Sequence, residues 1–122
     1  MNEPTAMDKR RYLRYEILDF ARVTADRPED GFSTVIVDIG LGGLQLRTKS
    51  LLPIGTCVQI EVAREDQNPI SLIGEVRHTA EIGGSDLFAM GVRFAPRTHE
   101  ERMAIADYVH RVFQRQCDLL TL

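Results

Sequence analysis

Apolar residues recur at every second position in several separate runs between Tyr15 and Phe94, which is the pattern of β-strands with one buried face. In the second run, the alternating apolar residues are Val35, Val37 and Ile39. Residues that favour turns, namely Gly, Pro, Asp and Asn, separate the runs. The predicted strands are 15–24, 34–39, 44–47, 58–62, 72–79 and 88–94. Six short strands at close spacing predict a small barrel or sandwich, and barrel closure also leaves no strand edge exposed.

The last quarter of the chain changes to a helical period. Thr98 followed by Glu101 is a capping box and predicts a helix start. An apolar stripe follows at helical spacing, made of Ile105, Tyr108, Val109, Val112 and Phe113. We expect a helix over 98–116 that packs this stripe against the β body. The apolar tail 117–122 can cover the barrel end, fray or dock on another chain, and the sequence leaves these alternatives open.

Length and composition indicate one globular domain. The chain has 122 residues, of which 43% are hydrophobic and 27% charged. A chain of this length buries roughly two thirds of its unfolded surface, so a core forms without disulfides. Cys57 and Cys117 are far apart and indicate reduced thiols of a cytosolic protein. The absence of a signal-peptide pattern or a long apolar stretch predicts a cytoplasmic protein without membrane insertion.

Residue patterns typical of enzymes and metal sites are missing from the sequence. His78, His99 and His110 are scattered and have no neighbour at the spacing of zinc ligands. Gly40 and Gly42 form a G-x-G, but Gln45 stands where a dinucleotide fingerprint needs its third glycine, and a strand follows. The sequence therefore predicts no catalytic activity, no metal and no cofactor.

The charge of the N-terminal segment differs from that of the rest of the chain. The net charge is −3, yet residues 8–14 contain four basic residues and one acidic residue. Arg10 and Arg14 are four apart and lie on one side in either a strand or a helix, so they can converge on one ligand. Arginine takes phosphate oxygens or the O6 and N7 edge of guanine in a bidentate way. Lys9 and Arg11 add positive charge next to these two arginines.

A second candidate feature is the run from Asp38 to Gly43, in which a strand-end carboxylate precedes Gly40, Gly42 and Gly43. A carboxylate can accept hydrogen bonds from the N–H edge of guanine. Glycines allow a ligand to approach the backbone or supply positive φ angles. A ligand with guanine and phosphate would satisfy both features. Each feature alone also fits an ordinary interpretation, a solvated tail or a simple turn.

In these motifs the sequence resembles the PilZ domain, a bacterial receptor for the second messenger cyclic diguanylate (cyclic di-GMP). The RxxxR motif of that family matches 10–14, and its (D/N)xSxxG motif matches 38–43. Further similar segments are 53–55, 74–77 and 90–94, followed by the helix. The resemblance implies a six-stranded antiparallel β-barrel with a C-terminal α-helix. It divides the chain into a flexible arm 1–14, a barrel 15–97, a helix 98–116 and a tail 117–122.

The resemblance also implies roles for individual residues. Arg10 and Arg14 would clamp the phosphates and guanine edges, Asp38 would bind a guanine, and Gly43 would hold the turn in shape. The position of Lys9 influences whether one nucleotide or a stacked pair binds, and its positive charge favours the pair. The remaining members of the implied ligand-binding set are Arg11, Gly40 and Gly42.

The motif departs from the family pattern at Gly40, which replaces the family's serine. Loss of one neutral hydrogen bond costs about 0.5–1.5 kcal/mol, or roughly threefold to tenfold in affinity, so binding is weakened and not abolished. Arg77 and His78 lie on a strand that often borders the site in the family. They either contact the ligand or form plain strand surface.

The function implied by the resemblance is a receptor that binds cyclic di-GMP, changes conformation and passes the signal to a partner protein, in processes such as motility and biofilm formation. An alternative is a ligand-independent adaptor, which the Gly40 replacement keeps open. Nucleic-acid binding fits poorly, because the chain is acidic and only 7% aromatic. The sequence is compatible with a monomer or a homodimer.

Overall fold

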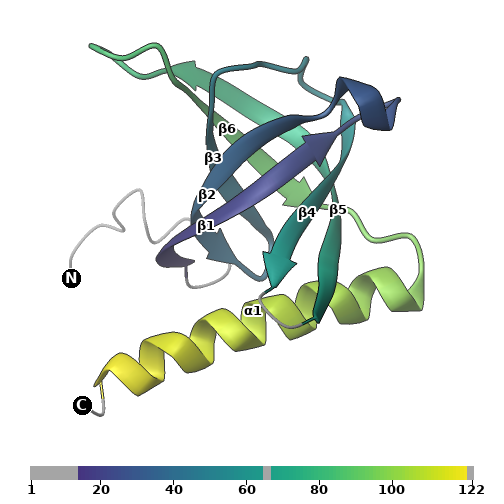
Figure 1. Cartoon of the computed structure of the whole chain (residues 1–122), viewed down its shortest axis with the longest axis vertical. Coiled ribbons are helices and arrows are strands. Elements are labelled where there is room, and N and C mark those ends of the chain that lie inside the picture. The colour runs from purple at the N-terminus through teal and green to yellow at the C-terminus, as the bar shows by residue number, and fades with distance from the viewer. Residues whose placement is uncertain (1–13, 65–66, 121–122) are drawn as a thin grey trace, which may run out of the picture.

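The computed structural model describes residues 14–64 and 67–120, which form a closed antiparallel β-barrel with a helix across one end (Figure 1). The strand order around the barrel is β1-β2-β3-β6-β5-β4. The elements are β1 (Arg14–Thr24), a short 3-10 turn η2 (Pro28–Asp30), β2 (Phe32–Gly40), β3 (Gly43–Thr48), β4 (Cys57–Arg64), β5 (Gln67–Glu81), β6 (Phe88–Phe94) and α1 (His99–Leu120). The predicted six-stranded antiparallel barrel with a C-terminal helix is confirmed.

Strand β2 does not follow the predicted alternation of apolar residues. Thr34, Ile36 and Ile39 are buried, whereas Val35 and Val37 are only half-buried. The register against β3 shifts between Ile36 and Asp38, so one extra residue of β2 bulges out of the ladder. The prediction that Val35 and Val37 form the buried face is therefore wrong, because a bulge changes which positions point inward. The buried hydroxyl of Thr34 donates to the carbonyl oxygen of Arg47 at 3.0 Å.

The core lies inside the barrel and is closed at one end by α1 (Figure 1). Large apolar side chains of every strand are fully buried there, among them Val23, Ile36, Leu44, Ile60, Leu72 and Met90. The helix adds the predicted stripe from Ile105 to Val112, while Phe113 at its end packs edge-on against Tyr15 with ring centroids 5.8 Å apart. The helix continues past the predicted end at residue 116 to Leu120. Residues 117–120 are thus helical and do not form the separate tail that the sequence predicted.

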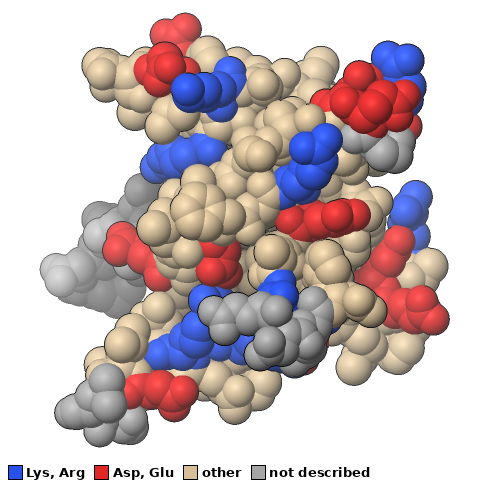
Figure 2. Space-filling model, in the orientation of Figure 1, with Lys and Arg blue, Asp and Glu red and all other residues tan. Residues whose placement is uncertain are grey.

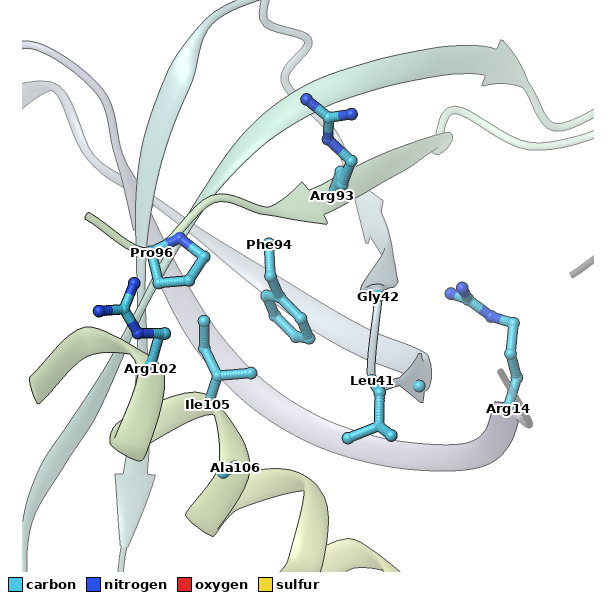
Figure 3. Close-up of a pocket in the computed structure, with 10 residues that line it drawn as sticks. Arg14, Leu41, Gly42, Arg93, Phe94, Pro96, Arg102, Ile105 and Ala106 are labelled. Atoms are coloured by element: carbon cyan, nitrogen blue, oxygen red, sulfur yellow. The ribbon is translucent and has the colours of Figure 1, made fainter. Parts of the chain in front are cut away.

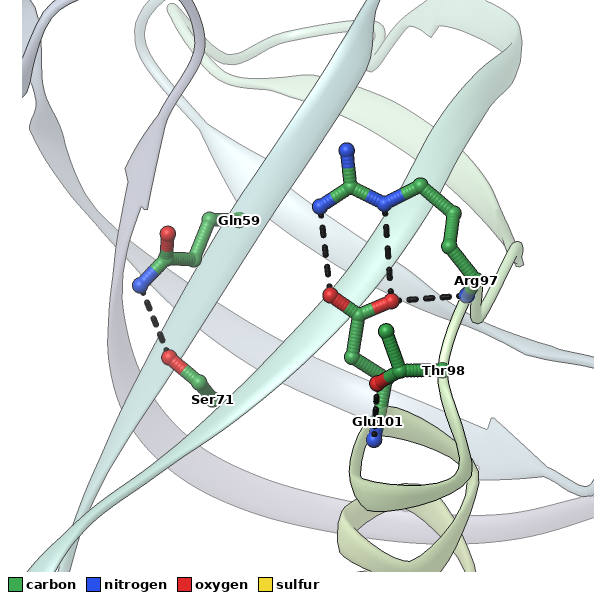
Figure 4. Close-up of polar contacts among 5 residues, drawn as sticks. All are labelled: Gln59, Ser71, Arg97, Thr98 and Glu101. Atoms are coloured by element: carbon green, nitrogen blue, oxygen red, sulfur yellow. Dashed lines mark hydrogen bonds and ion pairs between the residues drawn. The ribbon is translucent and has the colours of Figure 1, made fainter.

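The start of α1 is fixed by side-chain caps, as Figure 4 shows. The hydroxyl of Thr98 accepts the backbone N–H of Glu101 at 3.1 Å, which confirms the predicted N-cap. The Glu101 carboxylate accepts the backbone N–H of Arg97 at 2.6 Å and pairs with its guanidinium at 3.1 Å. The glutamate therefore reaches one residue further back than a standard capping box. A second polar contact in Figure 4 joins β4 to β5, where Gln59 donates to Ser71 at 2.8 Å.

A polar cluster fastens β1 to α1. The carboxylate of Asp19 on β1 accepts hydrogen bonds from the hydroxyl of Tyr108 and from both terminal nitrogens of Arg115, the latter at 3.0 and 3.2 Å. Burial alone would raise the pKa of Asp19, but the hydrogen bonds from Arg115 and Tyr108 outweigh it and hold the pKa below its ordinary value. Burial, together with the neighbouring carboxylate, raises the pKa of Tyr108, so this hydroxyl remains a donor.

Candidate ligand-binding site

The first residue of β1 and the end of β2 meet at one rim of the barrel. Arg14 lies opposite Gly40 in the ladder, and Glu16 lies opposite Asp38. This register brings the Nε of Arg14 to 2.5 Å from Oδ1 of Asp38, although the two residues are 24 positions apart. Their side chains are 19% and 22% exposed, so the pair is reachable from solvent.

The Arg14 guanidinium is only partly satisfied by this contact. Its Nη2 atom is buried and has no hydrogen-bond partner among the described residues. A buried N–H group without an acceptor costs about 1–3 kcal/mol, and such groups in native proteins call for an explanation. A guanidinium held by Asp38 with a free donor is already oriented to receive an acceptor, such as a phosphate or carbonyl oxygen.

A hollow of about 700 Å³ opens beside Arg14, between the β2–β3 turn, the end of β6 and the first turns of α1. Figure 3 shows Leu41, Phe94 and Ile105 between Arg102 of the helix and Arg14 of β1. The hollow thus combines apolar side chains with guanidinium groups. Such a surface suits a ligand that has both a flat apolar part and negative charge.

A second, smaller hollow of about 220 Å³ lies on the outer face of β3, β6 and β5 and shares Arg14, Gly42 and Arg93 with the first. Here Gln45 of β3 and His78 of β5 contact each other at 2.9 Å. Both lie opposite Gly91 of β6, the strand between them. A Cβ atom at 91 would overlap the His78 ring, so only glycine lets the ring reach across β6.

Gly43 is required for close packing between strands. It begins β3 opposite Arg93, and a Cβ atom there would overlap the carbonyl oxygen of Val92. Its φ angle is not positive, since among the described glycines only Gly55 and Gly84 have positive φ. The glycine therefore sets the distance between β3 and β6, and this packing differs from the turn-shaping role that the sequence suggested.

The structure brings together all of the predicted site residues that it describes, namely Arg14, Asp38, Gly40, Gly42 and Gly43, with Arg77 and His78 beside them. Lys9, Arg10 and Arg11 lie outside the described residues. Sequence reasoning missed Arg93, Arg102 and Gln45, because a lone arginine or glutamine carries no local signal. For this part of the site, the one signal in the sequence is Gly91 in the middle of a strand, because such a glycine often marks a place where another group packs closely against the backbone.

Positive charge gathers around the two hollows despite the overall charge of −3. The arginines are Arg14, Arg77, Arg93 and Arg102. Two carboxylates lie among them: Asp38 pairs with Arg14, and Glu75 contacts Arg77 at 3.1 Å and Arg93 at 3.9 Å. The local excess of positive charge favours an anionic ligand.

Residues 14–64 and 67–120 contain no group of His, Cys, Asp or Glu side chains that could hold a metal ion. Within the same ranges, α1 is not long and apolar enough to cross a bilayer.

Comparison with known proteins identifies a family. A family model described as PilZ domain matches residues 8–111. No curated protein matches the chain. Among solved structures, the PilZ domain of YcgR from Escherichia coli with c-di-GMP superposes with a TM-score of 0.67 and 15% identity, over 93% of this chain and 98% of that chain.

Two longer structures contain a similar fold. The MrkH–c-di-GMP complex of K. pneumonia gives a TM-score of 0.73 at 17% identity, over 90% of this chain and 55% of that one. The inhibitor of motility MotI/DgrA of Bacillus subtilis gives 0.67 at 16% identity, over 90% of this chain and 52% of that one. The chain therefore spans about half the length of these two structures. At these identities the similarity establishes the fold.

Proposed function

The chain belongs to the PilZ domain family, and from this membership and the geometry at Arg14 we propose that it is a receptor for cyclic diguanylate. The proposal draws support from the solved PilZ structures of YcgR and MrkH, which contain this ligand. It assigns the chain a binding role without catalysis.

The observation that carries the proposal is the hydrogen bonding of the Arg14 guanidinium. Asp38 holds its Nε at 2.5 Å, while its buried Nη2 has no acceptor in the described part of the chain. A guanine or phosphate oxygen of the ligand supplies the missing acceptor. Asp38 has a second carboxylate oxygen, which can accept from the N1–H and N2–H edge of a guanine.

The other predicted residues complete the proposed site. Arg10 joins Arg14 in clamping the phosphates, and Lys9 and Arg11 strengthen the positive field and favour a stacked ligand pair. Gly40 and Gly42 leave room for the ligand to approach the backbone, and Gly43 holds β3 against β6.

The smaller hollow gives a place for part of the ligand. The contact between Gln45 and His78 forms a fixed polar surface next to Arg77 and Arg93. A guanine base can stack on the His78 ring, and an arginine can take its O6 and N7 edge.

Ligand binding in this proposal connects residues 8–13, which include Arg10, to the barrel rim at Arg14. A ligand that contacts both parts shifts the equilibrium toward the arrangement in which they are joined. A partner protein then reads this arrangement, which makes the chain a signalling receptor.

Calorimetric titration of cyclic diguanylate into the purified chain tests the proposal, with guanosine monophosphate as the control ligand. We expect saturable binding that the Arg10→Ala/Arg14→Ala variant loses. Arg111→Ala is the matched control, because Arg111 pairs with Asp107 one turn earlier on α1, at 3.0 Å. That variant should bind like the wild type.

The opposite result would favour the adaptor alternative. Absence of binding heat, together with an unchanged melting temperature at high ligand concentration, would refute the receptor proposal. Gly40 in place of the family's serine is the feature that keeps the adaptor alternative open. Protein partners that bind the wild type and the Arg10→Ala/Arg14→Ala variant equally well would then identify an adaptor.

A further inference from the structure

The outer face of β1 is an exposed apolar stripe with charges of opposite sign at its two ends. The exposed residues of this strand are Glu16, Leu18, Phe20 and Arg22, in that order. Leu18 and Phe20 are 69% and 73% exposed. Val35, which lies opposite Phe20, and Val37 widen the stripe onto β2. We call the surface formed by these six residues the β1 face.

Strand β1 lies on the front of the barrel in Figure 1. Figure 2 shows uncharged surface along this strand, with acidic and basic side chains at its margins. An apolar area with a polar rim is typical of a protein interaction site. Neither hollow of the candidate ligand site is lined by Leu18, Phe20, Val35 or Val37, so the proposed receptor function does not account for the exposure of these residues.

The order of the charges indicates which partner fits. A twofold axis that lies in the interface, perpendicular to β1 and close to Asp19, reverses the strand direction in the second copy. Leu18 then meets Phe20 of the partner subunit, and Glu16 meets Arg22 of the partner subunit. The surface is therefore complementary to itself, which is the requirement of a twofold interface. We propose that the β1 face is a homodimer interface in which two copies pack with antiparallel β1 strands.

The charges also exclude the alternative orientation. If the two strands ran parallel, Glu16 would face Glu16 of the partner subunit, and Arg22 would face Arg22 of the partner subunit. Like charges at an interface oppose association. Arg22 also lies opposite Glu61 of β4, and its five N–H donors allow it to serve more than one acceptor.

The size of the β1 face sets the expected strength of the dimer. The stretch from Glu16 to Arg22 is roughly 20 Å long, and the face is two strands wide. Such a patch buries less than the roughly 1,200–2,000 Å² of a standard stable interface. We therefore expect a weak dimer that exchanges with the monomer and forms at about 100 µM or above.

Sedimentation equilibrium of the full chain without nucleotide, from about 10 µM to about 1 mM, tests the proposal. The average mass should rise from 13.8 kDa toward twice that value. Phe20→Ser should abolish the rise. Met103→Ser is the matched control, because Met103 is an apolar residue of α1 that is 54% exposed, and it should associate like the wild type.

Charge reversal tests the orientation. Glu16→Arg and Arg22→Glu each turn two attractive pairs per dimer into repulsive ones, so each variant should associate at least about tenfold more weakly than the wild type. A mixture of the two variants restores both pairs between unlike chains, so it should form a heterodimer. This rescue cannot result from misfolding of either variant.

Three results would overturn the proposal: a wild-type chain that stays monomeric at about 1 mM, association that survives Phe20→Ser, or charge variants that self-associate as well as the wild type. Failure of the mixture to associate would overturn it as well. Because no nucleotide is present, these outcomes are independent of the proposed receptor function.

Discussion

Replacement of Arg14 by methionine should separate a binding residue from a structural one. The change removes the ion pair with Asp38, in which both side chains are about one-fifth exposed, and this loss costs about 1–2 kcal/mol. It also removes the buried Nη2, which lacks an acceptor among residues 14–64 and 67–120, and this gain is about 1–3 kcal/mol. Methionine retains the apolar stem. We therefore expect the free energy of unfolding to fall by no more than about 1 kcal/mol, or about 4 °C in melting temperature.

The affinity for cyclic diguanylate should change far more than the stability. A charge-assisted hydrogen bond contributes about 1.5–3 kcal/mol, so its loss should weaken binding by about 10- to 150-fold. Urea denaturation measures the stability and calorimetry measures the dissociation constant. A loss of stability above about 2 kcal/mol with unchanged affinity would show that Arg14 is a structural residue, and the reasoning from its unsatisfied nitrogen would be wrong.

Three further substitutions test other parts of the structure. Asp19→Asn should lower the free energy of unfolding by about 1–3 kcal/mol at pH 7. Because the hydrogen bonds from Arg115 and Tyr108 hold the folded pKa of Asp19 below its ordinary value, this difference from wild type should shrink as the pH falls through the folded pKa. Urea denaturation over a pH series measures this, and a constant difference would contradict the assignment. Gly40→Ser should tighten calorimetric ligand binding by about threefold to tenfold, and unchanged affinity would refute a role for the missing hydroxyl. Gly91→Ala should displace the His78 ring, weaken ligand binding by about threefold or more and cost about 1–3 kcal/mol of stability, and normal affinity would exclude His78 from the site.

The barrel could be predicted from the sequence because its signals are local. Alternation of apolar residues marks each strand, and the Thr98–Glu101 pair marks the start of the helix. The buried face of β2 could not be predicted in the same way. Its bulge between Ile36 and Asp38 depends on pairing with β3, and periodicity within one strand contains no information about the neighbouring strand.

The difference between local signals and contacts made only on folding also explains which candidate site residues could be predicted from the sequence. Asp38 and the following glycines form a compact motif that can be recognised within a few residues. Arg93 and Gln45 line the candidate site only because β6 pairs with β3, and Arg102 only because α1 closes the barrel end. Their contribution arises from register and packing, so it appears only in the folded chain.

Strand β1 combines three tasks at neighbouring positions, and this arrangement allows the tasks to be tested separately. Arg14 at its start faces the proposed ligand site, Asp19 holds α1, and Phe20 is exposed on the opposite side from the core. Because these side chains do not share contacts, their effects should be additive and independent. Phe20→Ser should abolish self-association and leave ligand affinity unchanged, whereas Arg14→Met should do the reverse. If either substitution changed both properties, the ligand site and the β1 face would be coupled, and the independence argued from their separate contacts would be wrong.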